Sequence, residues 1–161
     1  MAVRLVVDGS EQVGAWLKGL DAEVKARVVK AVNSGANAIR NDVVDNIRNG
    51  EKTGRMYGDH QASAPGEAPA TDTGELISGV SFEIDSDGFG ASVISRAPYS
   101  LALELGTSGN RSIGKEDKIA LQGPGFGDGH IEPRPFMLPA FEKNREAIQE
   151  AIADAYNGAK S

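Results

Sequence analysis

The feature of this sequence that most limits its fold is a long stripe of apolar residues with helical spacing. Between Ser10 and Asn49 apolar residues recur three or four positions apart, while the charged residues fall off the stripe. Ser10 is a suitable N-cap and Gly50 a suitable stop. We therefore predict a helix over residues 10–49, with Trp16 in the core and a kink or break at 33–35, where Asn, Ser and Gly are poor helix formers.

Two further segments alternate apolar and polar residues with the period of a β-strand. Residues 3–7 predict a short opening strand, and residues 80–84 predict a half-buried one. A Ser-Asp-Gly turn at 86–88 follows, and apolar residues alternate again over 89–93. The second strand, the turn and the return strand together predict a β-hairpin.

Two shorter helices are expected after the hairpin. Pro98 suits the first turn of a short helix that Gly106 closes, because a missing amide costs little there and glycine tolerates unusual backbone angles. The last helix is predicted from Pro139 to Tyr156, with a narrow apolar stripe. With 161 residues the chain predicts one α+β domain, in which a small antiparallel sheet packs against a long N-terminal helix and a C-terminal helix.

Two long stretches have the composition of loops. Residues 51–72 and 107–132 are rich in glycine and other small or turn-forming residues, and they lack a sustained apolar period. Such stretches bury too little surface to offset the entropy of ordering them. We predict two mobile loops that order when a partner binds, because long loops in small domains are usually functional.

Composition excludes several classes of protein. The chain has no cysteine, so a disulfide framework, a zinc ribbon and a thiol nucleophile are excluded. No apolar run approaches the roughly 20 residues of a membrane helix, and the start has neither a basic leader nor a long apolar stretch. We therefore expect no membrane association and no secretory signal.

The residues offer little support for catalysis. His60 and His130 are the only histidines, and both fall in predicted loops. Asp128, His130 and Glu132 place three possible metal ligands at alternate positions, but a glycine-rich loop gives them no rigid platform. We predict that the chain is not an enzyme and that it has no catalytic residue, no metal site and no cofactor.

Contact with nucleic acid has equally weak support. A net charge of −6 opposes it, because nucleic-acid binders gain most of their affinity by neutralising phosphates. Arg111, Lys115 and Lys118 could touch DNA, but Glu116 and Asp117 lie among them. Direct DNA contact therefore stays open without being predicted.

Three segments, read together, are similar to a known family. They are Ser-Ala-Pro-Gly-Glu-Ala-Pro-Ala-Thr-Asp-Thr-Gly-Glu-Leu at 63–76, Tyr-Ser-Leu-Ala-Leu-Glu-Leu-Gly-Thr at 99–107 and Arg-Pro-Phe-Met-Leu-Pro-Ala-Phe-Glu at 134–142. In this order the chain resembles the tail-completion or head–tail joining proteins of long-tailed bacteriophages, the minor tail protein Z family. The positions that carry the resemblance, and that are candidates for motif or interface roles, are Pro65, Gly66, Thr73, Gly74, Leu76, Tyr99, Glu104, Gly106, Thr107, Arg134, Pro135, Phe136 and Pro139.

Most of these positions also have a structural interpretation. Gly74 and Gly106 suit unusual backbone angles, and Phe136 is expected to fill the core where the last helix begins. Glu104 is expected to have a definite partner, either Thr107 or a backbone amide, and an interface role is an equal alternative. The link over residues 108–132 is longer than is usual for the family, so contacts made by that link are not carried over.

The resemblance implies a structural virion protein that completes the tail and helps to join it to the head, as a ring of subunits. It implies manufacture in the host bacterial cytoplasm and a final place in the tail or neck of the virion. The implied partners are the tail tube, the tail terminator and the head-completion protein. A tail terminator or a head-side adaptor or stopper of the same neck is the first alternative, and a small metal-dependent enzyme is the second.

Overall fold

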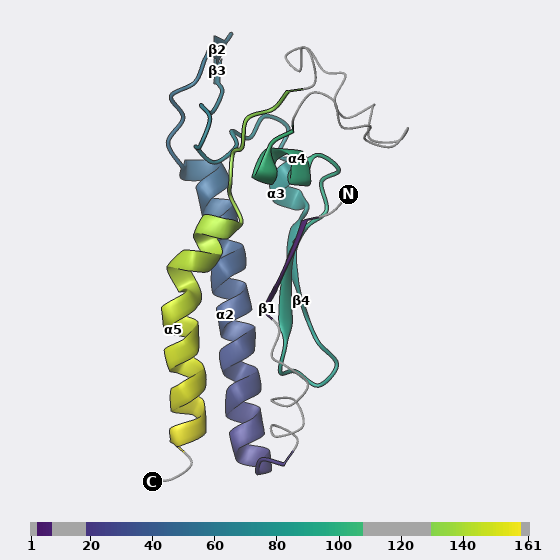
Figure 1. Cartoon of the computed structure of the whole chain (residues 1–161), viewed down its shortest axis with the longest axis vertical. Coiled ribbons are helices and arrows are strands. Elements are labelled where there is room, and N and C mark those ends of the chain that lie inside the picture. Colours follow the sequence, from purple (N-terminus) through teal and green to yellow (C-terminus); the bar gives the residue numbers. More distant parts are fainter. Residues whose placement is uncertain (1–2, 8–18, 108–129, 159–161) are drawn as a thin grey trace.

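A long helix in the middle of the molecule organises the fold. The computed structural model describes residues 3–7, 19–107 and 130–158. Within the described residues three helices and five strands precede the last helix, and α2 and α5 are the two long helices (Figure 1). The elements are β1 (Val3–Val7), α2 (Ala22–Asn49), β2 (Met56–Tyr57), β3 (His60–Gln61), α3 (Glu75–Ser78), β4 (Val80–Ile84), β5 (Ala91–Ser95), α4 (Ser100–Leu105) and α5 (Leu138–Asn157).

The long helix α2 is shorter at its start than the apolar stripe predicts. It begins at Ala22, after a turn and a bend at residues 19–20, because Gly19 is a poor helix former and Asp21 takes the N-cap position. Ser10 and Trp16 lie outside the described residues. The helix ends before Gly50, as predicted.

A break at residues 33–35 is wrong, because α2 is continuous from Ala22 to Asn49. Gly35 has a different role. It is buried against α5, and a Cβ added there would lie 2.8 Å from Ile148 Cγ1. The glycine therefore lets the two long helices approach closely. The packing of α5 on α2 keeps residues 33–35 helical although they are poor helix formers.

The main sheet has three antiparallel strands in the order β1-β5-β4. The predicted opening strand and hairpin are confirmed, with Leu5 opposite Val93 and Phe82 opposite Val93 on either side of β5. The hairpin turn is longer than predicted: it spans residues 85–90, and Phe89 lies in it, with its amide donating to Asp87 Oδ1. All five residues of the central strand β5 are buried.

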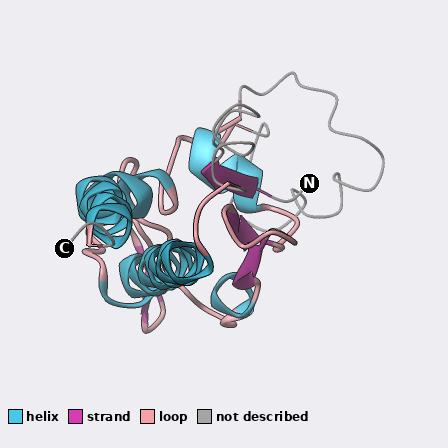
Figure 2. Ribbon diagram, turned by 90° about the horizontal axis from the view of Figure 1, so that it is seen from below, coloured by secondary structure: helices cyan, strands magenta, loops and turns pink. Residues whose placement is uncertain are grey.

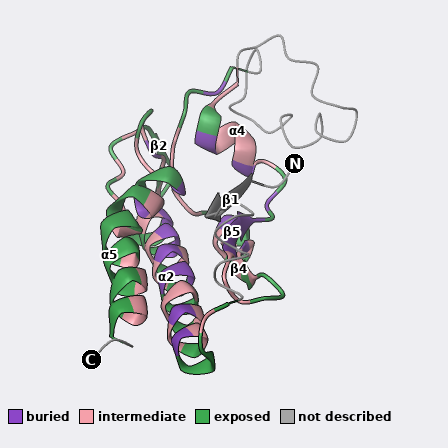
Figure 3. Ribbon diagram, turned by 60° about the horizontal axis from the view of Figure 1, so that its bottom comes forward, coloured by how far each residue is buried: buried purple, intermediate pink, exposed green. Residues whose placement is uncertain are grey.

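The predicted α+β architecture is confirmed, and the contacts show how its layers are arranged. The helix α2 packs on β4 and β5, while α5 packs mainly on α2, on the side away from the sheet. Figure 2, looking along the helices, shows α2 and α5 side by side with the strands of the sheet to one side. The narrow apolar stripe of α5 can cover one neighbour only, so most of its surface is exposed (Figure 3).

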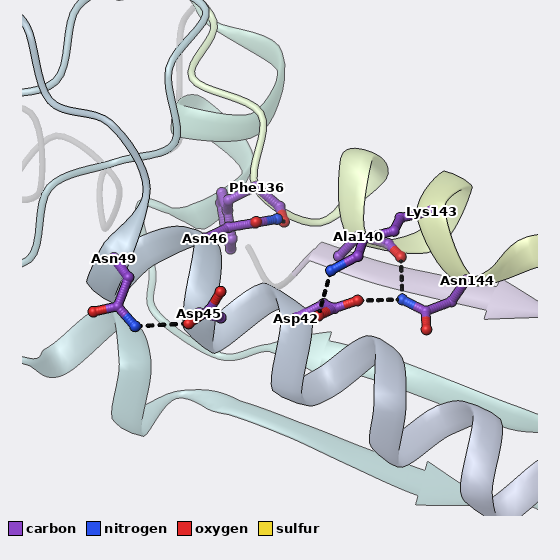
Figure 4. A network of polar contacts seen from close by, with 8 residues as sticks. All are labelled: Asp42, Asp45, Asn46, Asn49, Phe136, Ala140, Lys143 and Asn144. Atoms are coloured by element: carbon purple, nitrogen blue, oxygen red, sulfur yellow. Dashed lines mark hydrogen bonds and ion pairs between the residues drawn. The ribbon is translucent and has the colours of Figure 1, made fainter.

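Polar contacts join α2 to α5 along one seam (Figure 4). Asp42 accepts hydrogen bonds from Lys143 Nζ at 3.0 Å and Asn144 Nδ2 at 2.6 Å. Burial alone would raise the pKa of Asp42, but the Asn144 hydrogen bond and the Lys143 ammonium outweigh it, so that this pKa lies below its ordinary value. At the far end Arg27 Nε donates to the Ala155 carbonyl at 3.1 Å, near the end of α5.

The core fills the space between the sheet, α2 and the start of α5. Val43, Ile47 and Phe136 are fully buried, with 0% of their surface exposed, which confirms that Phe136 lies in the core. The helix α5 starts at Leu138 with Pro139 in its first turn, close to the predicted boundary. The short helix α4 starts at Ser100, two residues after Pro98, and ends at Gly106 as predicted.

Candidate functional site

The segments that carry the family resemblance meet at one end of the molecule. The strands β2 and β3 lie beyond the C-terminal end of α2, while α3 and α4 lie beside that end, together with the strand-like approach to α5 (Figure 1). We call this part the apical region, and define it as residues 51–79, 96–107 and 130–137.

The prediction that residues 51–72 lack structure is wrong. Residues 56–61 form a two-stranded hairpin, with Tyr57 opposite His60. The carboxylate of Glu67 accepts hydrogen bonds from the amide and hydroxyl of Thr53 and from the amide of Ala64. These bonds hold the pKa of Glu67 below its ordinary value, with the Thr53 hydroxyl the largest cause. Local side-chain-to-backbone bonds thus replace the apolar burial that the segment lacks.

Hydrogen bonds tie the first motif segment to the third. The amide of Gly66 donates to the carbonyl of Pro133 at 2.8 Å, and Arg134 Nε donates to the carbonyl of Ser63 at 3.3 Å. Gly66 has φ +84°, so the tight turn there favours glycine. Residues about 70 positions apart in the sequence are therefore joined by one hydrogen bond between main-chain groups and one from a side chain to the main chain.

The second segment is joined to the third as closely. The amide of Arg134 donates to the carbonyl of Leu103 at 2.6 Å, and Thr107 forms an antiparallel bridge with Ile131. Gly106, between them, has φ +71° and ψ 175°. A Cβ there would lie 2.6 Å from the Ile131 carbonyl oxygen, so both the angles and the space require glycine.

Glu104 holds the start of α5. The residue is 8% exposed, and its carboxylate accepts hydrogen bonds from three successive amides: Oε2 from Phe136 at 2.9 Å and Met137 at 3.1 Å, and Oε1 from Leu138 at 2.9 Å. The expected backbone-amide partner is thereby confirmed. Met137, at the N-cap position, supplies no capping side chain, so a carboxylate from α4 satisfies amides that a helix leaves unpaired.

The first segment meets the second through Tyr99. Its hydroxyl donates to Glu75 Oε2 at 3.4 Å, and burial together with the Glu75 carboxylate raises the pKa of Tyr99. Gly74 adopts φ +79° at the N-cap of α3, where Thr73 Oγ1 accepts from the Glu75 amide at 3.4 Å. The predicted special angles of Gly74 and Gly106 are both confirmed.

The remaining predicted positions divide between core and surface. Leu76 is buried, Pro135 is half-buried, and Pro65 and Pro139 are exposed. The structure thus brings the three segments together as one hydrogen-bonded framework. It assigns most of the predicted positions to holding that framework.

Exposed apolar side chains surround this framework. The large hydrophobic residues exposed among those described are Met56 at 53%, Tyr57 at 55%, Leu105 at 67% and Leu138 at 47%. They lie on β2, on α4 and at the first position of α5, all in or next to the apical region. The guanidinium of Arg55 lies 5.4 Å from the centroid of the Tyr57 ring, a cation–π distance.

A cleft of about 710 Å³ lies between the β2–β3 hairpin and the strand-like approach to α5. His60 and His130 both line it, with Asp72, Glu132 and Arg134. Within residues 19–107 and 130–158, no group of three or more His, Asp or Glu side chains could hold a metal ion. Asp128 and the basic residues Arg111, Lys115 and Lys118 lie outside the described residues.

The hairpin and its exposed side chains are what sequence reasoning missed. The signal was present as Gly58-Asp59, a two-residue turn between Met56-Tyr57 and His60-Gln61. Gly58 indeed has φ +62°. The cleft could not be predicted, because its lining residues come from distant parts of the chain.

Comparison with models of known families, with curated proteins and with solved structures gives no match to this chain. Among the described residues, no helix has the length and apolar character needed to span a bilayer. What the chain does therefore has to be inferred from its own residues.

Proposed function

We propose that this chain is a structural, non-enzymatic virion protein of the bacteriophage neck, which completes the tail and helps to join it to the head as a ring of subunits. The observation that carries this proposal is the convergence of the three motif segments in one apical region. Each segment alone is a common pattern, but hydrogen bonds link 63–66 and 103–107 to the same short stretch at 131–138. Three motifs that keep the family's order in the sequence and also contact one another in the structure support membership of that family.

The chemistry of the apical region favours binding over catalysis. Glu104, the most buried of its carboxylates, has its oxygens occupied by three backbone amides, so it serves as an anchor for α5 rather than as a free acid or base. Exposed Tyr and Met side chains on a short hairpin are the residue types that are enriched where proteins bind proteins. The inferred partners are the neighbouring neck and tail proteins, with Tyr57 and Met56 among the contact residues.

The first experiment removes the chain from the virus. A stop codon early in its gene should give filled heads beside unjoined or defective tails in electron micrographs of the lysate. Supplying the wild-type chain from a plasmid should restore infectious particles. Normal infectious particles from the stop-codon virus would overturn the proposal.

A second experiment tests the contact residues in the same complementation assay. The Met56→Ser, Tyr57→Ser double variant should restore few infectious particles, although its circular dichroism and melting temperature stay close to wild type, because both side chains are exposed. Gln149→Ala, on the exposed face of α5, is the matched control and should restore full yield. Full yield from the double variant would show that the hairpin makes no essential contact.

The enzyme alternative makes the opposite prediction about the cleft. His60 and His130 are its candidate groups, because they line the same cleft. Replacing both with alanine should leave the phage yield nearly unchanged if the protein is structural. A collapse in yield with unchanged folding and unchanged head–tail joining would favour the enzyme alternative.

A further inference from the structure

The three-stranded sheet has two open edges among the described residues. The strand order is β1-β5-β4, so β1 and β4 each pair with β5 and with no other described strand. An unpaired edge strand presents a row of amide and carbonyl groups that can pair with another chain.

The register shows which backbone groups point outward. The amide of Asp85 donates to the carbonyl of Gly90, and the amide of Arg96 donates to that of Gly79. Odd-numbered residues of β4 therefore bond to β5, and Val80, Phe82 and Ile84 direct their amides and carbonyls to the open side. By the same alternation across β5, Arg4 and Val6 direct their backbone groups away from the sheet on β1.

Each edge carries one charged residue, Glu83 on β4 and Arg4 on β1, but neither carries a proline, a lysine or a bulge. The strand β4 reads Val-Ser-Phe-Glu-Ile, without proline, lysine or glycine, and it pairs with β5 over all five residues without a bulge. The strand β1 reads Val-Arg-Leu-Val-Val and also pairs without a bulge. Natural proteins usually protect edges more heavily, so two edges on one sheet with a single charged residue each suggest that they are used.

A groove beside β4 has the character of an interface. It has a volume of about 520 Å³ and lies between Phe82 and the face of α2 that carries Ala26, Val29 and Asn33. Lys30 is its one charged residue among the described lining residues. Depletion of charge is what distinguishes the centre of a protein–protein interface from the remaining surface.

We propose that β1 of a second copy of this chain adds to the open edge of β4, so that the sheet continues from subunit to subunit. Each subunit then uses two different edges, and such a head-to-tail contact closes into a ring when the rotation between neighbours allows it. The inference rests on the proposed function for the ring in which the contact occurs.

The direction and register of this pairing follow from the sheet itself. Both β1 and β4 run antiparallel to β5, so β1 and β4 are parallel to each other within one subunit. If the ring axis runs along the strands, the rotation that relates neighbouring subunits keeps β1 of the second copy parallel to β4. Full overlap places Phe82 beside Leu5 of the second copy. The outward amides and carbonyls of Val80, Phe82 and Ile84 then alternate with those of Arg4 and Val6 of the second copy, in the evenly spaced pattern of a parallel ladder.

The absence of cysteine makes a clean cross-linking test possible. In the proposed register Glu83 lies beside Val6 of the second copy, and neighbouring strands bring Cα atoms within the range of a disulfide. Within one chain the same two positions are separated by β5, about 10 Å, which is too far for a disulfide. The E83C, V6C double variant should therefore give, on oxidation at high protein concentration, a ladder of trimers and larger species on a non-reducing gel.

The single variants E83C and V6C are the controls, and both should remain monomeric on the gel. Dimers of E83C alone, in the amount given by the double variant, would show a twofold β4–β4 contact instead. A double variant that stays monomeric would also overturn the proposal, because oxidation traps even a weak encounter.

A backbone substitution separates the edge from the side chains. In the double-cysteine chain Ile84→Pro removes an outward amide and no bond to β5, while Ile84→Ala shortens the side chain and keeps the amide. The ladder should fall several-fold with proline and stay within about twofold with alanine, at unchanged circular dichroism. Equal ladders would overturn strand addition. If the double-cysteine chain gives the ladder on the gel but the stop-codon virus yields normal virions, the neck function alone is refuted. If the gel shows no ladder but the stop-codon virus yields unjoined heads and tails, the edge contact alone is refuted.

Discussion

Replacing Glu104 should show how much one carboxylate contributes to the start of α5. In Glu104→Gln the side chain keeps its size, but the amide nitrogen cannot accept a hydrogen bond. At least one of the three bonds to Phe136, Met137 and Leu138 is then lost. A hydrogen bond to a charged group contributes about 1.5–3 kcal/mol, and a charge at a helix N-terminus adds about 0.3–1 kcal/mol.

We therefore expect Glu104→Gln to lower the free energy of unfolding by about 2–4 kcal/mol. Glu104→Ala leaves the amides of Phe136 and Met137 without an acceptor in a buried place, and should cost about 3–6 kcal/mol. Urea denaturation followed by far-ultraviolet circular dichroism measures both, with the denaturant slope checked for constancy.

Glu142→Gln is the matched control, because Glu142 lies in the same helix and is exposed. It should change the free energy of unfolding by no more than about 0.5 kcal/mol. Hydrogen exchange adds a local measurement, since the amides of residues 136–138 should exchange faster in Glu104→Gln. Equal stabilities of the Glu104→Gln and Glu142→Gln proteins would refute the anchoring role.

Three other changes test separate parts of the fold. Gly35→Ala should destabilise the protein by about 1–2 kcal/mol because the new Cβ contacts Ile148, yet it should stabilise the Ile148→Ala protein by up to about 1 kcal/mol because alanine is the better helix former. Urea titrations of the wild type, the two single variants and the double variant measure both effects. A change in stability of the same sign in both backgrounds would contradict the explanation. Because the pKa of Asp42 is lowered in the folded state, its contribution is present above the ordinary carboxyl pKa of about 3.9 and is lost as pH falls through the lowered value. Asp42→Asn should accordingly lose stability less steeply than wild type in acid titrations of the unfolding free energy, and parallel curves would count against the interaction. Gly106→Ala should lower the free energy of unfolding by at least about 3 kcal/mol, because the positive φ and the neighbouring atoms both oppose a Cβ. Gly58→Ala, where a Cβ meets nothing within 4 Å, should lower it by about 1 kcal/mol. Similar melting temperatures for the two variants would exclude the steric part of this explanation.

Sequence periodicity predicted the elements that bury one clear face. The hairpin of β4 and β5, the strand β1 and the helix α5 were all predicted from the spacing of their apolar residues. The start of α2 could not be predicted from this spacing, because the apolar stripe begins before the turn at residues 19–20 and continues through it. The stripe records which residues are apolar, and it does not record where the backbone turns.

Tertiary contacts explain the other differences. The weak helix formers around Gly35 stay helical because Ile148 packs on them, and that contact comes from a residue more than 100 positions away. Residues 51–72 are ordered by Glu67 and by the carbonyl of Pro133, which no local pattern reveals. For Glu104 the sequence predicted a definite partner, either Thr107 or a backbone amide, but it could not identify the three amides that bind the carboxylate.

The hydrogen bonds of the apical region also set the order in which the chain can fold. The contacts of Glu104 span 32 to 34 residues, and the bond from Gly66 to Pro133 closes a still longer loop. Contacts between distant residues form slowly, because the entropy of loop closure has to be overcome first. A chain still emerging from the ribosome can form α2 and the hairpin of β4 and β5, but it cannot complete the apical region until residues 133–138 have been made. A chain truncated before residue 133 would therefore lack the hydrogen bonds that tie Gly66 and Glu104 to the start of α5, and its apical region would be incomplete.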